Sequence, residues 1–228
     1  MPNPVFGPKT FAYLRDLAAN NDRAWFDAHL ADYEAQVREP ALAFIEAMAV
    51  ELPFISTHFT AIPRKVGGSL MRVYRDTRFA RDKTPYKTNV GIQFRHEAGK
   101  DVHAPGYYVH LAADECFVGL GLWRPDAPAL GRIRDLIVET PEAWIAARDN
   151  PEFRKHFALR GESLSNAPRG YPKDHPLLSD LRRKDFIAMS IFTQTQATGN
   201  KLQPLVLERM RAATPLMRFL CKAVELPF

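Results

Sequence analysis

Apolar residues over the first sixty positions recur every three or four places, for example at Phe11, Leu14 and Leu17. This spacing is typical of amphipathic helices. We expect Thr10 to cap the first of these helices, and the cluster Asn20–Asp22 to end it and cap the next. Pro40 fits the first turn of a third helix, where its missing N–H costs nothing. Residues 1–63 are therefore predicted to be helical.

From about Pro63 the chain changes to short segments that are rich in β-branched and aromatic residues and are separated by Gly, Pro, Asp or Asn. Such segments are typical of strands. We expect strands at Ser69–Arg75, Val90–Arg95, Gly106–Ala112, Glu115–Leu122 and Phe186–Thr193. Little more than Ala113-Asp114 separates the third from the fourth, which predicts a hairpin and a sheet that is at least partly antiparallel.

Helical spacing returns after residue 125. We expect helices at Asp126–Val138, Pro141–Arg148, Pro151–Leu159, His175–Arg183 and Leu202–Val224, the last broken near Pro215. Helices at both ends of an antiparallel core predict an α+β fold, with a mostly antiparallel sheet flanked by N-terminal and C-terminal helices. A chain of 228 residues fits one such domain. Its parts would be a helical part (1–63), a β-rich basic part (64–125) and a mixed helical part with one further strand (126–228).

The composition is ordinary for a globular protein, with 46% hydrophobic and 25% charged residues. The chain starts Met-Pro-Asn-Pro, without the basic and apolar regions of a signal peptide, and has no run of about 18 apolar residues. We therefore expect a soluble cytoplasmic protein with no membrane partner. Cys116 and Cys221 lie in a predicted strand and a predicted helix, and we expect both to be buried free thiols.

Positive charge is concentrated in one part of the chain. Residues 64–87 contain eight basic and two acidic residues, a local net charge of +6, whereas the whole chain carries +5. A patch of one sign usually has a partner of the opposite sign. Because Tyr and Phe alternate with Arg and Lys in this window, it offers both charged donors and aromatic faces. The pattern predicts an anion-binding site, without identifying the anion.

Residues in and near this window are the candidates for ligand binding: Arg72, Tyr74, Arg75, Arg78, Lys83, Tyr86, Lys87, Trp123 and Arg169. Asp76 and Asp82 are expected to orient the arginines. Equally, Arg–Asp pairs such as Arg75 with Asp76 or Arg81 with Asp82 would simply fasten a loop. The sequence does not decide whether a reaction takes place; if it does, Lys83, Tyr86 and His175 are candidate acid–base groups by residue type alone.

A second pattern predicts a hollow on the sheet. In the strand that ends near Trp123, Phe117, Gly119 and Gly121 share one face with that tryptophan. Glycines on one face of a strand leave room for a ligand or another backbone, or for a packed helix. Tyr108 and His110 share a face of the preceding strand. We expect a pocket with aromatic walls and a glycine floor, with Arg72 and Lys83 at its edge.

Familiar catalytic and cofactor motifs do not account for these features. GxxxxGK[ST], GxSxG and HExxH do not occur, and Gly119-Leu-Gly121 does not continue as a dinucleotide motif. His96, His103 and His110 recur every seven residues without carboxylates at set spacing, so we predict no metal site and no cofactor.

Five segments together resemble a known family: Asn20–His29, Ser69–Phe94, Gly106–Pro125, Ala167–Pro176 and Leu181–Phe186. They are similar to the bacterial and fungal family filed as domain of unknown function 2461. The resemblance extends over nearly the whole chain and implies a complete single-domain member of that family. It implies no catalytic residue.

Three functions are consistent with these patterns. The first is a pocket that binds a small anionic ligand bearing phosphate, carboxylate or sulfate. The second is a nucleic-acid-binding module that uses the Arg64–Lys87 basic ribbon. The third is a scaffold for an acidic partner protein. Because Asp76 and Asp82 within the basic motif favour a shaped pocket over an open ribbon, the small ligand ranks first.

Overall fold

A six-stranded sheet is the centre of the fold in the computed structural model, which describes residues 5–99 and 104–228. The strands, in spatial order, are β1 (Phe59–Thr60), β2 (Asn89–His96), β3 (Gly106–Ala112), β4 (Cys116–Leu122), β6 (Phe186–Phe192) and β5 (Ala158–Arg160). Every neighbouring pair is antiparallel. The predicted α+β class is therefore confirmed.

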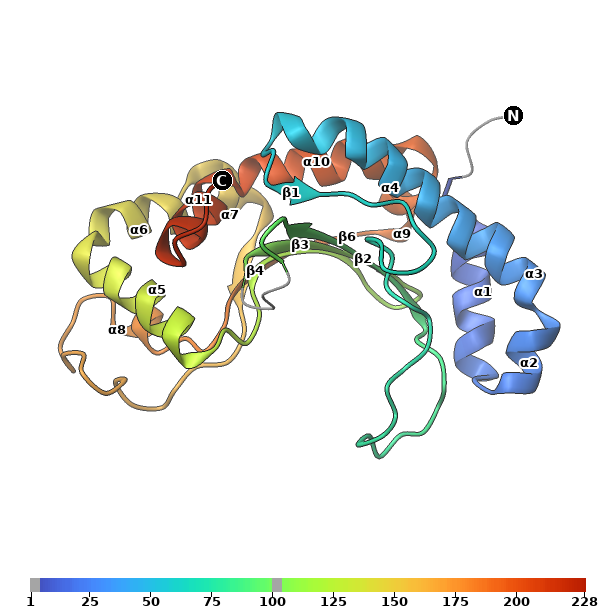
Figure 1. The fold of residues 1–228 in the computed structure, drawn as a ribbon, viewed down its shortest axis with the longest axis horizontal. Coiled ribbons are helices and arrows are strands. Elements are labelled where there is room, and N and C mark those ends of the chain that lie inside the picture. Colours follow the sequence, from blue (N-terminus) through green and yellow to red (C-terminus); the bar gives the residue numbers. More distant parts are fainter. Residues whose placement is uncertain (1–4, 100–103) are drawn as a thin grey trace.

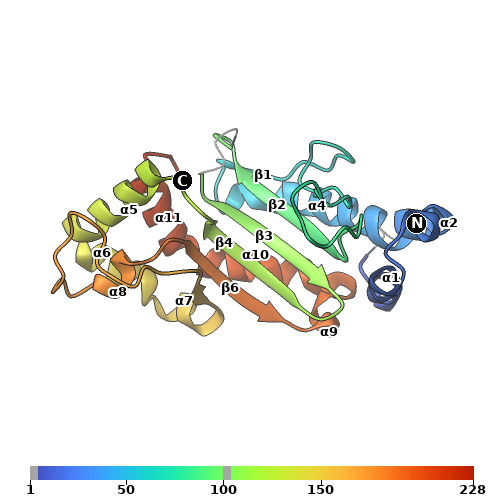
Figure 2. The same ribbon diagram turned by 90° about the horizontal axis from the view of Figure 1, so that it is seen from below.

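The helices cover one face of the sheet and both of its ends. They are α1 (Pro8–Ala19), α2 (Arg23–Ala28), α3 (Leu30–Tyr33), α4 (Glu39–Glu51), α5 (Ala127–Glu139), α6 (Pro141–Arg148), α7 (Pro151–His156), α8 (Leu178–Leu181), α9 (Gln194–Ala197), α10 (Leu202–Ala212) and α11 (Thr214–Ala223). Single turns of other helix types lie at Glu34–Arg38, Leu52–Phe54 and Gly199–Lys201. Helices α4 and α10 pack on one face (Figure 1), and the opposite face is left open (Figure 2).

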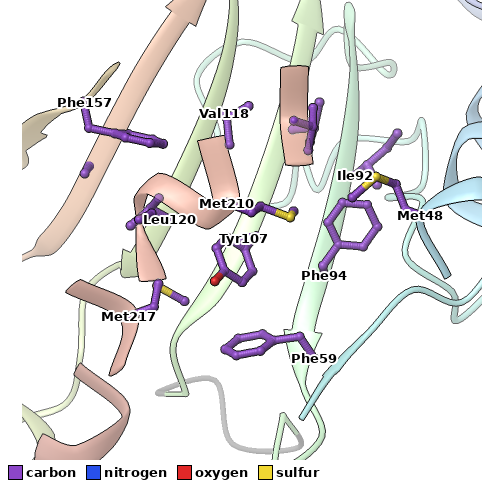
Figure 3. Close-up of a cluster of buried hydrophobic side chains, with 14 of the residues drawn as sticks. Met48, Phe59, Ile92, Phe94, Tyr107, Val118, Leu120, Phe157, Met210 and Met217 are labelled. Carbon is purple, nitrogen blue, oxygen red and sulfur yellow. The ribbon is translucent and has the colours of Figure 1, made fainter. Parts of the chain in front are cut away.

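The main hydrophobic core lies between the sheet and its covering helices. Alternate strand residues such as Phe94, Tyr107 and Val118 are fully buried there. Met48 of α4 and Met210 of α10 pack onto them (Figure 3). Because side chains alternate between the two faces of a strand, the remaining residues of β2, β3, β4 and β6 point to the open face. The packing of one face thus fixes which side chains are available on the other.

Most predicted elements are confirmed. Asn20 ends α1, Asp22 caps α2 by accepting from the Trp25 N–H at 2.9 Å, and Pro40 lies in the first turn of α4. The Ala113-Asp114 hairpin and the break before Pro215 are also observed. Cys116 and Cys221 are buried free thiols.

Four predictions of local structure are wrong. Gly7, not Thr10, is the N-cap of α1, and the Thr10 hydroxyl instead donates to the Gln36 carbonyl. Ser69–Arg75 forms only isolated bridges at Leu70 and Tyr74, because no further strand lies beside it. The helix expected at Pro151–Leu159 ends at His156, and residues 158–160 instead pair with β6 as a strand. The helix expected at His175–Arg183 is confined to α8.

Among the helices of the described residues, none is both long and apolar enough to cross a membrane.

Candidate functional site

The open face of the sheet carries an ordered set of side chains. Strand register places Gln93, Tyr108, Gly119 and Met189 in one row across β2, β3, β4 and β6. The row on one side of it contains Arg95, Gly106, Gly121 and Ile187. The row on the other side contains Gly91, His110, Phe117 and Ile191. Glycine therefore occupies central positions in the first two rows, between larger side chains.

The first two rows, together with Phe117 of the third, line a cavity of about 670 Å³ that is mostly apolar. Its walls include Tyr108, Phe117 and Trp123, with Met71 and Met189 nearby. The volume lies within the range of about 300–1,000 Å³ that is usual for small-molecule sites. The residues expected to form aromatic walls and a glycine floor thus lie around one cavity, without Arg72 and Lys83 at its edge, and its role as a binding site stays a prediction.

The glycines of the floor differ in what the fold requires of them. Gly121 has φ +107°, and a Cβ there would lie 2.0 Å from the Phe186 carbonyl oxygen. At Gly106 and Gly119, by contrast, a Cβ would meet only ordinary contacts at 3.5 Å or more. The backbone thus demands glycine at Gly121 but not at Gly106 or Gly119, where the missing side chain leaves the space of the cavity.

Two arginines lie at one end of the cavity. Arg95 projects from β2, and both its Nε and its Nη2 donate to Oε1 of Gln93, at 3.0 and 2.8 Å. Arg124 follows β4, and its guanidinium lies 5.0 Å from the centre of the Trp123 ring. The Asp185 carboxylate accepts from the Arg124 N–H at 2.8 Å and thereby anchors this segment. The cavity therefore combines an apolar body with a cationic end.

A polar cluster forms on the same face beside the cavity. The Tyr108 hydroxyl lies 3.0 Å from Nδ1 of His110, and the Asn89 amide nitrogen lies 3.4 Å from both atoms. The His110 ring stacks on Phe117 at 4.7 Å, and a Cβ at Gly91 would lie 2.8 Å from the Tyr108 hydroxyl. Burial raises the pKa of Tyr108, which keeps its hydroxyl protonated, and lowers the pKa of His110. A protonated hydroxyl therefore faces a neutral imidazole, and Tyr108 donates to Nδ1 when the ring carries its proton on Nε2.

We predict that His110 titrates below its ordinary pKa of about 6.5 and carries its proton on Nε2 at pH 7. Burial disfavours the imidazolium and outweighs the nearby carboxylates of Asp114 and Glu115, which favour it. The unfolded chain would therefore take up this proton first, so the contribution of His110 to stability is complete above pH 6.5 and declines as the pH falls below it. NMR of the ring nitrogens across this range measures both properties. A pKa above 6.5, or a proton on Nδ1, would contradict the prediction.

Residues 70–88 leave the sheet as a hairpin, here called the basic arm, which hangs below the open face (Figure 1). Its two sides are joined by backbone hydrogen bonds from Lys87 to Val73 and from Arg75 to Pro85. Arg75 forms an ion pair with Asp82 and a hydrogen bond with Thr84. The guanidinium of Arg78 donates two hydrogen bonds to the Asp76 carboxylate, at 2.7 and 3.0 Å. Lys83 donates to the Thr77 carbonyl at 2.9 Å.

These contacts correct the expected pairing within the basic arm. Arg75 binds Asp82 across the hairpin and not its neighbour Asp76, which binds Arg78 instead. Arg78 and Arg75 hold the pKa of Asp76 well below its usual range and that of Asp82 at about 2, so both carboxylates stay ionised. Asp76 and Asp82 thus do orient arginines, but they do so to fasten the arm.

Of the predicted ligand-binding residues, Trp123 lines the cavity, and the basic arm contributes only Met71 to its wall. Arg72, Arg75, Arg78, Lys83 and Lys87 are not brought to the cavity. Tyr86 is only 2% exposed and stacks on Phe26 at 4.0 Å, while Tyr74 packs beside it at 5.4 Å. Tyr86 is therefore part of the core that anchors the arm to α2.

The loop at residues 167–176, which contains Arg169 and His175, does not line the cavity either. Arg169 is exposed, and Nδ1 of His175 accepts from the Leu177 N–H at 3.1 Å. Tyr171 donates to Asp135 of α5 at 2.7 Å, which fixes this loop to the helical lobe. Of the three evenly spaced histidines, His96 faces the covering helices and His110 the open face, while His103 lies outside the described residues.

Sequence reasoning missed Arg95, Arg124 and Gln93. Arg124 directly follows Trp123, so its place at this end of the strand could be inferred from the sequence. The sequence shows which residues of β2 share a face with Arg95. Only the strand register shows that Arg95 is in the same row as Gly106 and Gly121. The cations of residues 64–87, which the local charge singles out in the sequence, are thus not the cations that line the cavity.

Comparison with known proteins gives one match. The model of a family described as conserved hypothetical protein (DUF2461) matches residues 9–219. No curated protein and no solved structure matches the chain.

Proposed function

For this chain, which belongs to the conserved hypothetical protein family DUF2461, we propose a function that is based on the geometry of the open face. The protein binds a small anionic ligand with a planar, apolar body. The body would lie over Gly106 and Gly119, between the rings of Phe117 and Trp123. The anionic group would lie at Arg95 and Arg124.

One observation carries this proposal. Glycine inside a strand costs about 0.5–1 kcal/mol relative to alanine. At Gly106 and Gly119 neither the backbone nor a neighbouring atom requires it. The two glycines lie diagonally to each other on the adjacent strands β3 and β4, and they leave a floor of peptide groups without side chains. A planar ring is the ligand body that fits such a floor.

The charged end supports an anionic group. Arg95 is held in place by two hydrogen bonds to the neutral Gln93 side chain, and Arg124 is held by stacking on Trp123. Arginine side chains positioned in this way lose little entropy when they bind a carboxylate, sulfonate or phosphate.

We predict that 8-anilino-1-naphthalenesulfonate binds the protein at least about tenfold more tightly than N-phenyl-1-naphthylamine, which has the same rings without the sulfonate. A hydrogen bond to a charged group contributes about 1.5–3 kcal/mol, and 1.4 kcal/mol corresponds to a factor of ten. Fluorescence titration of both probes measures the ratio. Arg95→Gln and Arg124→Gln should weaken sulfonate binding and leave the neutral probe unchanged.

Arg132→Gln is the matched control, because Arg132 is exposed on α5 and does not line the cavity. It removes the same charge and should alter neither titration. If neither probe binds the wild-type protein, the proposed cavity function is wrong. If the two bind equally well, the anionic part of the proposal is wrong.

A further inference from the structure

The basic arm keeps cations that the fold does not neutralise. It carries six basic and two acidic residues, a net charge of +4. The two carboxylates are used by Arg75 and Arg78. Within the described part of the chain, the side chains of Arg72, Arg81 and Lys87 have no hydrogen bond and no carboxylate partner. Burial, and secondly the charge of nearby Arg72, lowers the pKa of Lys87. An approaching anion would relieve this repulsion.

The same arm exposes aromatic rings. Phe79 is 96% exposed near the tip, and the guanidinium of Arg78 lies 5.9 Å from the centre of its ring. Tyr74 is 54% exposed on the side of the arm. A ring this exposed buries almost no surface within the fold, so it is available to a partner. Because the ion pairs and Lys83 hold the hairpin together, the rings and cations are presented on an ordered support.

We infer that the basic arm binds single-stranded nucleic acid, with phosphates at Arg72, Arg81 and Lys87 and a base stacked on Phe79. Arg72 and Lys87 lie at the root of the arm, on the sheet side of the Tyr74–Tyr86 bridge, and Arg81 lies beyond the bridge toward the tip. The three cations are therefore spread along the arm, as the phosphates of a linear polyanion are spread along its chain. A flat anionic membrane would touch only the tip. Arginine and aromatic rings in alternation are the side chains that recognise phosphates and unpaired bases. This inference concerns the arm and does not depend on what occupies the cavity.

The test is fluorescence anisotropy with labelled oligo(dT) and oligo(rU) of twenty nucleotides. Binding should weaken as salt rises, and the double variant Arg72→Ala/Arg81→Ala should reduce the slope of log K against log salt by about 1.4, at about 0.7 for each phosphate contact. Phe79→Ser should weaken binding roughly tenfold at unchanged slope, because it removes stacking and no charge. Thermal unfolding should be unchanged in these variants, since the altered side chains are exposed.

The matched control is Arg15→Ala/Arg211→Ala, which removes the same charge from exposed positions on α1 and α10. It should leave both affinity and slope close to those of the wild type. The inference is overturned if the wild-type protein does not bind at 50 mM salt, or if the control variant loses as much affinity as the arm variant. Binding to phosphatidylserine vesicles, lost in Phe79→Ser, without binding to either oligonucleotide would also overturn it.

Discussion

Replacing Gly121 with alanine should lower the free energy of unfolding by about 3 kcal/mol. The new methyl group would lie 2.0 Å from the Phe186 carbonyl oxygen, and φ at this position is +107°, which L-residues rarely adopt. Because the Phe186 carbonyl is backbone, no side-chain rotation relieves the contact. Strands β4 and β6 would have to separate near Leu122 and Phe186, which are paired. Chemical denaturation of the variant and the wild type measures the difference.

Gly119→Ala is the matched control for this prediction, because it makes the same change two residues earlier in the same strand. Its Cβ would approach nothing closer than 3.5 Å, from the Phe117 ring. We expect stability equal to that of the wild type, or higher by up to about 1 kcal/mol, because alanine restricts the unfolded chain more than glycine does. Equal destabilisation by the two substitutions would contradict the distinction between a glycine required by the fold and one that leaves space for a ligand.

The strands that the sequence predicts well are those with neighbours on both sides. In β3 and β4 the alternation of apolar and small or polar residues is regular, because one face meets α10 and α11 and the other remains open. Ser69–Arg75 has a similar composition but was wrongly predicted, because whether a strand forms depends on an available partner. Past the bridge of Leu70 to Ile92 this segment pairs only with its own return at Tyr86.

The candidate site was predictable where its residues come from one or two adjacent strands. Phe117, Gly119 and Trp123 follow from alternation alone, and Tyr108 follows from the hairpin. The charged end was not predictable in this way. Local sequence left open that Asp76 and Asp82 fasten a loop through arginines, but it did not show which arginine each carboxylate binds, because the pair of Arg75 with Asp82 forms across the hairpin.

Gly119→Leu should weaken the binding of 8-anilino-1-naphthalenesulfonate at least about tenfold without lowering stability. The position lies centrally in the row formed by Tyr108 and Met189, so a leucine side chain would occupy the middle of the cavity. Its first carbon has room beside Phe117, and contact with the surrounding apolar groups should compensate for ordering the side chain. Forcing a ligand into a filled site costs about 1–3 kcal/mol, so affinity should fall at least about tenfold.

The control is Gly131→Ala in α5, where a Cβ would meet nothing within 4 Å. This variant should be slightly more stable than the wild type and bind the probe with unchanged affinity. Titration of the sulfonate probe into the wild type, Gly119→Leu and Gly131→Ala, each shown to be folded by thermal unfolding, tests the cavity most directly. We predict weaker binding in Gly119→Leu alone; a folded Gly119→Leu variant that binds the probe as tightly as the wild type would contradict a ligand site on the open face.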